Sequence, residues 1–350
     1  MLTIVYCNKS NDSDKSISNK NIKNNEPKNK TKNNPNEDTS GKIFDNIPLQ
    51  KDFKTLPFNA KTILRFSPKA LFKDRPFLMS NEAKIWDSYF EKLGIDLKRD
   101  IEVLYAASPL SIVDFRDDFI ANIYGNFPPD LEKNLSKIAR EESDLPIINK
   151  KPSVENIDGM LTFTNPIEGI TIGFADKNTI FACSHYRIKE TISLLRNNED
   201  KNITDNEKMN EYINELKDYS SFLMIGDVED KAKEILKGFA FADTQYKTLQ
   251  QILGNMKLIK IGTKYDNGME IYIGIELSSE DIASDFTDRI NTELMLLRPS
   301  SPLTKKLIPL IKFEEDDTES ICKLSLNKQE WEDITKSVFG DKKEDKKTKK

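Results

Sequence analysis

Apolar residues fall into short runs with strand-like alternation, and between these runs they recur at helical spacing. Strands are predicted at 62–66, 101–107, 119–127, 160–163, 170–175, 179–184, 221–227, 257–265, 269–277, 307–313 and 320–326. Helices are predicted at 81–93, 128–140, 228–253, 331–339 and in a long segment that Ser278 or Ser279 caps. Antiparallel strand pairs interrupted by helices favour an α+β fold over a doubly wound parallel sheet.

A similar order of elements returns after residue 220, which suggests an internal duplication. We therefore predict two similar halves, 61–200 and 201–340, each an antiparallel sheet with helices packed on one face. The polar stretches 141–157 and 197–208 are predicted to be loop insertions. The second of them marks the predicted boundary between the halves.

The clearest hairpin in the chain joins the runs 257–265 and 269–277. A two-residue loop would place apolar residues opposite polar ones on the same face. A three-residue loop ending at Gly268, in the left-handed conformation of a bulge, instead places Ile273 opposite Ile261 and Ile275 opposite Ile259. The sequence therefore predicts this second register.

The N-terminus changes abruptly from apolar to polar. Residues 1–7 read Met-Leu-Thr-Ile-Val-Tyr-Cys, and Asn8, Lys9 and Ser10 follow at once. This segment resembles the end of a bacterial lipoprotein signal peptide, in which a short apolar stretch precedes the cysteine that is acylated. The resemblance implies that Cys7 carries the lipid and that the chain is anchored to a membrane of the cell envelope. One explanation for the short apolar segment is that translation begins upstream of Met1, so that residues 2–6 end a longer apolar segment. The alternative is a cytoplasmic protein with a frayed apolar N-terminus.

Both ends of the chain are strongly polar. Residues 8–41 are rich in Asn, Lys, Ser, Asp and Thr, and such a composition buries too little apolar surface to fold. We predict that 8–60 is a mostly disordered tether, which would let a folded domain stand clear of a membrane to which Cys7 is attached. Residues 341–350 are predicted to be a disordered basic tail.

The composition excludes several classes of function. Basic and acidic residues, 53 and 58 in number, are interspersed along the chain and give a net charge of −5, so nucleic acid is not an expected partner. The chain contains no run of about 18 apolar residues, so a transmembrane helix is not predicted. The single histidine, His185, rules out sites that need two imidazoles. No motif indicates a cofactor, and we predict neither a cofactor nor a metal site.

Two of the three cysteines occupy similar positions in the predicted halves. Cys183 and Cys322 each lie in the last strand of a half, just before a helix. If the halves pack about a pseudo-two-fold axis, these cysteines could form a disulfide; two separately buried thiols are the commoner outcome. Cys183 lies close to His185, but nothing around them supplies an oxyanion hole, so we predict no catalytic residue here and read His185 as an ordinary strand-end histidine.

Two acidic clusters and two strand glycines have plain structural interpretations. Asp114, Asp117 and Asp118, and the run 314–317, lack the ligand spacing of a calcium loop, so we predict solvated hairpin turns. Gly262 and Gly274 lie inside predicted strands, where close packing explains them.

These observations favour a non-enzymatic envelope lipoprotein that acts as a binding or interaction module. The expected partners are a membrane, through Cys7, and a protein that contacts a surface of the folded part or a cleft between its halves. Two alternatives stay open: a hydrolase-type enzyme whose site is built from dispersed carboxylates, and a cytoplasmic protein of unknown role.

Overall fold

The computed structural model describes residues 52–72, 94–134 without 113, 137, 153–165, 169–197, 201–228, 254–296 without 267, and 302–339. The segment 1–51, the helix predicted at 81–93, most of the helix predicted at 228–253 and the tail 341–350 lie outside these residues. The acylation of Cys7 and the disorder of the two ends therefore stay predictions.

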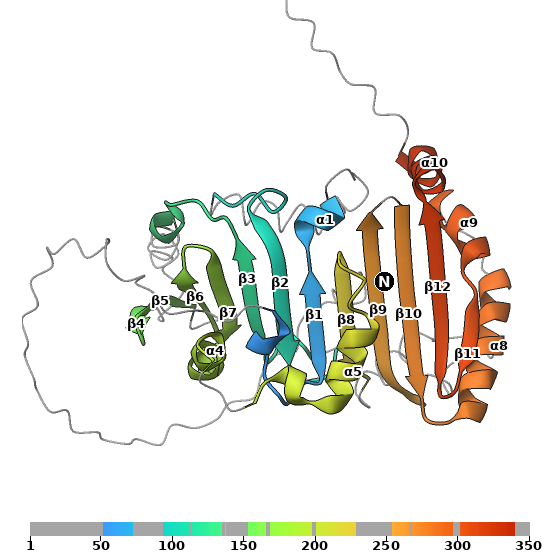
Figure 1. Ribbon diagram of the computed structural model, residues 1–350, viewed down its shortest axis with the longest axis horizontal. Helices are drawn as coiled ribbons and strands as arrows, with labels where there is room; N and C mark the ends of the chain where they lie inside the picture. The colour runs from blue at the N-terminus through green and yellow to red at the C-terminus, as the bar shows by residue number, and fades with distance from the viewer. Residues whose placement is uncertain are drawn as a thin grey trace, which may run out of the picture. The chain divides into compact units, whose positions relative to one another are not determined.

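One antiparallel sheet of twelve strands dominates the fold, and the predicted α+β class is confirmed (Figure 1). The strands are β1 (Thr62–Phe66), β2 (Ile101–Ser108), β3 (Ile120–Gly125), β4 (Ser153–Ile157), β5 (Met160–Asn165), β6 (Ile170–Asp176), β7 (Thr179–Ser184), β8 (Phe222–Asp227), β9 (Met256–Asp266), β10 (Gly268–Leu277), β11 (Phe313–Asp316) and β12 (Glu319–Asn327). Their order across the sheet is β11-β12-β10-β9-β8-β1-β2-β3-β7-β6-β5-β4.

The two sheets expected from the sequence are joined into one. Strand β1 pairs with β2 on one side and with β8 on the other, so Thr62 faces both Ser108 and Gly226. From this junction the order runs β1-β2-β3-β7-β6 in one direction and β8-β9-β10-β12-β11 in the other. The expectation of two separate sheets is therefore wrong, and an internal duplication stays a prediction.

Helices cover both faces of the sheet, so the expectation that helices pack on one face only is wrong. The back face, which carries Ile275 and Cys322, packs against α8 (Glu280–Leu296), and neighbouring back-face residues pack against α10 (Lys328–Phe339). The front face, which carries Tyr105 and Phe181, packs against α4 (Ile188–Leu195) and α5 (Glu207–Glu215). Shorter helical segments are α1 (Pro68–Phe72), α9 (Pro302–Leu307), η2 (Phe53–Thr55), η4 (His185–Arg187), η5 (Ile203–Asp205) and η6 (Ile308–Leu310).

The β9–β10 hairpin has the predicted register. Ile273 faces Ile261 and Ile275 faces Ile259. Gly268 has a φ of 156°, so it does not adopt the left-handed helical conformation that was predicted. A side chain at this position would meet the carbonyl oxygen of Leu326 at 2.1 Å, which explains the glycine by close packing of β10 on β12.

Residues 52–60 form a strap across the front face, blue in Figure 1 between α4 and α5. Leu56 is 0% exposed and Phe53 is buried against Tyr105, with ring centroids 5.0 Å apart. The strap also bridges to Asn202 through Pro57. The predicted end of the tether at residue 60 is therefore wrong, because Phe53, Leu56 and Ala60 are part of the core.

Three other predictions need correction. Instead of the strand predicted at 307–313, the chain forms α9, η6 and only then β11. Strand β4 lies within the stretch predicted to be a loop at 141–157, and α5 begins inside the predicted loop at 197–208. These elements have charged or mixed sequences, so their apolar periodicity is weak.

Candidate functional site

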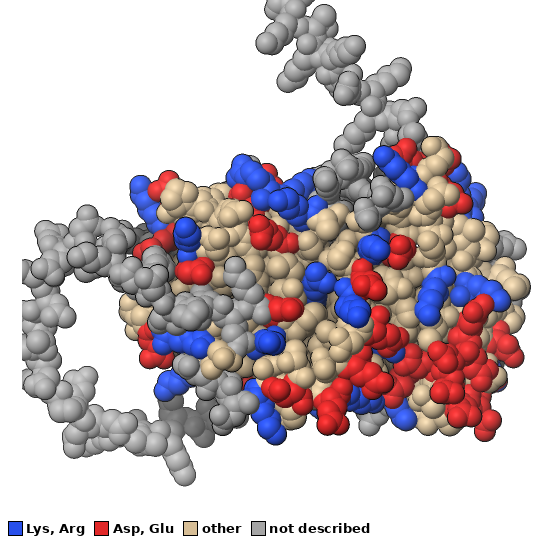
Figure 2. All heavy atoms as spheres, in the orientation of Figure 1, with Lys and Arg blue, Asp and Glu red and all other residues tan. Residues whose placement is uncertain are grey.

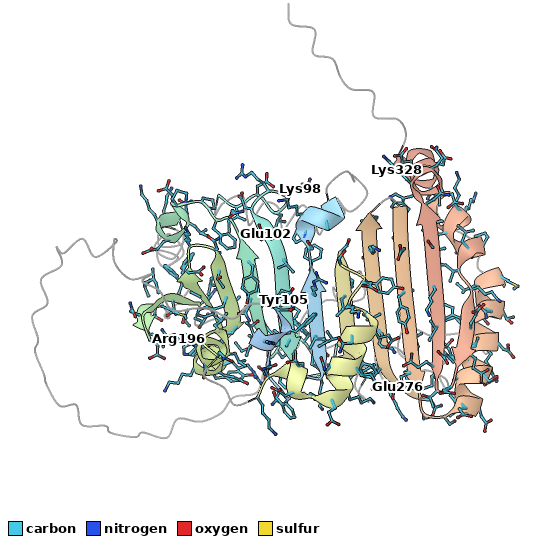
Figure 3. All side chains as sticks on the ribbon, viewed as in Figure 1. Lys98, Glu102, Tyr105, Arg196, Glu276 and Lys328 are labelled. Carbon is cyan, nitrogen blue, oxygen red and sulfur yellow. The ribbon has the colours of Figure 1, made fainter. Side chains whose placement is uncertain are left out.

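Among the described residues, a dense group of interacting charged and aromatic side chains lies on the front face, where α5 meets the second half of the sheet. We call it the lysine cluster, and its members are Lys260 of β9, Tyr272 and Glu276 of β10, Glu319 of β12, and Lys208, Tyr212 and Glu215 of α5. Figure 3 labels Glu276 near the end of β10, beside α5.

Lys260 occupies the centre of the cluster. Its side chain is only 2% exposed, and its ammonium lies 2.6 Å from Glu215 Oε2 and 2.7 Å from Glu319 Oε1. The same nitrogen lies 5.0 Å from the ring centroid of Tyr212 and 5.9 Å from that of Tyr272. Two carboxylates and two aromatic faces therefore replace the water that a buried ammonium loses.

A second set of contacts completes the cluster. Tyr272 donates a hydrogen bond to Glu215, and Tyr212 donates one to Glu276. Lys208 lies 3.2 Å from Glu276. Glu276 and Glu319 are directly opposite each other on neighbouring strands, an arrangement that is unfavourable for like charges unless cations lie nearby. Figure 2 shows acidic side chains gathered around this end of the sheet.

The surroundings shift the ionisation of the two opposed carboxyls in different directions. Burial raises the pKa of Glu319, and the nearby charges of Glu215 and Glu276 add to the rise that Lys260 opposes. Burial also acts to raise the pKa of Glu276, but the hydrogen bond from Tyr212 and the contact with Lys208 lower it overall. Burial and the bond to Glu215 raise the pKa of Tyr272.

Close packing explains two strand glycines, as the sequence predicted: Gly274 makes room for the cluster and Gly262 for the neighbouring Tyr219. Gly274 lies directly opposite Lys260, and a side chain there would come within 2.9 Å of the Tyr272 ring and 3.1 Å of Lys260 Cε. A side chain at Gly262 would meet the ring of Tyr219 at 2.6 Å. The cluster was not predicted from the sequence, although a glycine opposite a lysine in the predicted hairpin was a usable signal.

The chemistry open to the lysine cluster is limited by its own contacts. A lysine acts as a nucleophile when its nitrogen can reach a substrate, and the Lys260 nitrogen is held between two carboxylates of the fold itself. Both carboxylates that contact Lys260 also hold other elements of the fold: Glu215 is the last residue of α5, and Glu319 is the first of β12. The cluster is therefore suited to fastening α5 to the sheet.

A second ion-pair group lies on the first half and includes one of the predicted acidic residues. Arg187 donates through Nε and Nη2 to the two carboxylate oxygens of Asp118 and through Nη1 to Glu190 at 2.7 Å. Arg187 is 10% exposed and Asp118 is 13% exposed. Asp118 therefore fixes its loop to the start of α4, and the prediction of a solvated turn is wrong for this residue.

The cysteines predicted as a possible disulfide are far apart. Cys183 and Cys322 are both buried and free. Six strands lie between β7 and β12, so seven inter-strand spacings of about 4.8 Å put the two roughly 34 Å apart, and a bridge within the chain is ruled out. Burial raises the pKa of the Cys183 thiol to about 11, which leaves little thiolate at neutral pH.

His185 contacts threonines rather than Cys183. Its Nδ1 lies 3.0 Å from Thr171 Oγ1, and Thr171 in turn lies 2.9 Å from Thr164 Oγ1. The backbone N–H of His185 donates to Gly169 O at 2.7 Å. These contacts anchor the end of β7 to β5 and β6, as expected of a strand-end histidine.

No protein-family model and no curated protein matches this chain. Two solved structures of a protein named TP0453 are similar in fold. Crystal form III gives a TM-score of 0.46 at 8% identity and covers 83% of this chain and 99% of that chain. Crystal form I gives 0.44 at 11% identity, with 83% and 98% covered. At these scores the likeness carries no functional argument.

Among the described residues, no helix is long and apolar enough to cross a membrane.

Proposed function

We propose that this chain is a non-enzymatic lipoprotein of the bacterial cell envelope, anchored through Cys7, whose folded part binds a protein partner. The apolar residues before Cys7 and the polar segment after it support the anchor. The strap supports it as well, because the N-terminal segment enters the fold through buried Phe53 and Leu56, and a pull on the tether would be resisted by the core.

The observation that carries the binding role is that the Lys260 ammonium is bound by carboxylates of the fold itself. Within the described residues, the polar side chains of the lysine cluster are therefore used to hold α5 on β9, β10 and β12. The front face beyond α5 is different, because Lys323, Ser325 and Asn327 of β12 are exposed there while the back-face residues of the same strand are buried. This open surface is where we place the partner.

The anchor is tested by replacing Cys7 with Ala in the native host, with the natural upstream codons retained. The wild-type chain is expected in the membrane fraction, and Cys7→Ala is expected to leave it. Cys183→Ala is the matched control, because it removes a buried thiol that bears no lipid. Equal membrane association of wild type and Cys7→Ala would refute the anchor.

The binding surface is tested by photo-crosslinking in intact cells. A photoreactive residue at position 323 is expected to yield a discrete protein adduct, and the same residue at exposed position 132 of the first half is not. Failure to form an adduct at 323, or the same adduct from both positions, would contradict the assignment of the front face.

An enzyme with a site of dispersed carboxylates is the second candidate. Its specific support is that the pKa of Glu319 is raised while that of the opposed Glu276 is lowered, a divergence typical of acid–base pairs. Hydrolysis of p-nitrophenyl esters or glycosides by the wild-type chain, lost in Glu319→Gln, would favour this candidate over the binding role. We expect no such hydrolysis.

A further inference from the structure

Two hydrogen-bonding atoms beneath the strap have no protein partner. Asn122 and Thr179 are both 0% exposed. Asn122 Oδ1 and Thr179 Oγ1 are among the buried side-chain atoms of the described residues that make no hydrogen bond. An unpaired polar atom in a protein interior costs about as much as a lost hydrogen bond, so each such atom calls for an explanation.

The two residues are neighbours on the front face. Asn122 of β3 faces Phe181 of β7, and Tyr124 faces Thr179. Asn122 and Thr179 are therefore diagonal neighbours, whose Cα atoms are expected to lie about 7–8 Å apart. Their side chains lie on the same face of the sheet, and a water molecule bridges two polar atoms when each lies about 3 Å from it.

The orientation of the Asn122 amide is fixed by its other contact. Its Nδ2 donates to Thr55 O at 3.1 Å, and because a carbonyl only accepts, the amide cannot be reversed. Oδ1 therefore needs a donor. The Thr179 hydroxyl can donate or accept, and Tyr124 lies beside it, with its own hydroxyl 3.4 Å from Thr55 Oγ1. The surroundings are polar enough to hold a water molecule.

We propose that a buried water molecule binds between Asn122 Oδ1 and Thr179 Oγ1 and helps to fasten the strap to the sheet. The water donates one hydrogen to Asn122 and completes its bonding with the Thr179 hydroxyl. It ties β3 to β7 directly below Thr55, the strap residue that Asn122 and Tyr124 already hold. This role does not depend on the acylation of Cys7 or on the identity of a partner.

The sign of one stability change tests the proposal. Thr179→Val keeps the shape and removes the hydroxyl. If a water binds there, its loss should raise the equilibrium constant for unfolding roughly two- to ten-fold. Thr62→Val is the matched control, because Thr62 is a buried strand threonine whose hydroxyl donates to Leu110 O at 2.9 Å. Urea unfolding should show a loss of stability of the same order in Thr179→Val and Thr62→Val.

If Thr179 Oγ1 has no partner, removing it relieves a desolvation cost, and Thr179→Val would be unchanged or more stable while Thr62→Val is weakened. That result would overturn the proposal. A crystal structure of the full chain gives a second readout that does not depend on folding of a variant. An ordered water within hydrogen-bonding distance of both atoms is expected, and a well-ordered site without one would contradict the proposal.

Discussion

Lys260 and Arg187 show two ways in which this fold holds a buried cation. Each is bound by two carboxylates, but the Arg187 side chain is 10% exposed and that of Lys260 only 2%. The planar guanidinium matches both oxygens of Asp118 and still reaches Glu190. The lysine ammonium is a point charge, and it depends on tyrosine rings to fill the rest of its surroundings.

The two cations differ in the elements that they join and in the negative charge that would remain if the cation were removed. Arg187 comes just before α4 and joins a loop to the first turn of this helix, where Glu190 is only three residues further along the chain. Lys260 joins α5, β9 and β12, which are distant in the sequence, and its carboxylate partners lie beside Glu276. Loss of the lysine charge therefore leaves more uncompensated negative charge, and we expect larger effects in the lysine cluster.

The largest expected effect is that of Lys260→Met. The methionine fills the space of the lysine stem but leaves Glu215 and Glu319 without their cation, so the free energy of unfolding should fall by about 3 kcal/mol. Urea unfolding measures this loss. Lys264→Met is the control, because Lys264 lies 3.7 Å from Glu270 in a more exposed pair and its loss should cost less than about 0.5 kcal/mol. Similar losses in both variants would refute a special role for Lys260.

Arg187→Lys keeps the positive charge and removes the planar fork of the guanidinium. A lysine cannot bind both oxygens of Asp118 and Glu190 together, so the free energy of unfolding should fall by about 1–2 kcal/mol. Arg289→Lys at the more exposed contact with Asp285 should change it by less than about 0.5 kcal/mol. If the midpoint of urea unfolding is the same for Arg187→Lys and wild type, the planar fork contributes nothing to stability.

The smallest expected effect concerns Glu319 and depends on pH. Because burial raises its pKa above the ordinary value of 4.5, the folded chain binds this proton more tightly than the unfolded chain. The contribution of Glu319 to stability therefore increases as the pH falls through the raised pKa. Glu319→Gln should be slightly more stable than wild type at pH 7, by less than about 1 kcal/mol, and this advantage should shrink toward pH 4.5. If Glu319→Gln lost as much stability at pH 7 as Lys260→Met, the raised pKa of Glu319 would be contradicted.

The sequence predicts local elements well and long-range connections poorly. β1 and β7 have the predicted bounds, because a short apolar run bounded by polar residues is a local signal. The pairing of β1 with β8, which turns two expected sheets into one, depends on residues about 160 positions apart, such as Thr62 and Gly226. No local pattern encodes that contact.

The candidate site shows the same limit. Within the β9–β10 hairpin, the predicted register already places Gly274 opposite Lys260, which indicates a space beside the lysine. The groups that fill the space come partly from α5, which begins in a segment predicted to be a loop, and from β12. A lysine in a strand is ordinarily exposed, so its burial could be seen only once these elements are placed.

The intact mass of the native protein recovered from its source membranes decides whether the chain is a lipoprotein anchored through Cys7. We expect a mature chain that begins at Cys7 and carries the additional mass of two or three acyl chains. An unmodified chain that retains Met1 and is recovered away from the membrane would contradict the lipoprotein assignment.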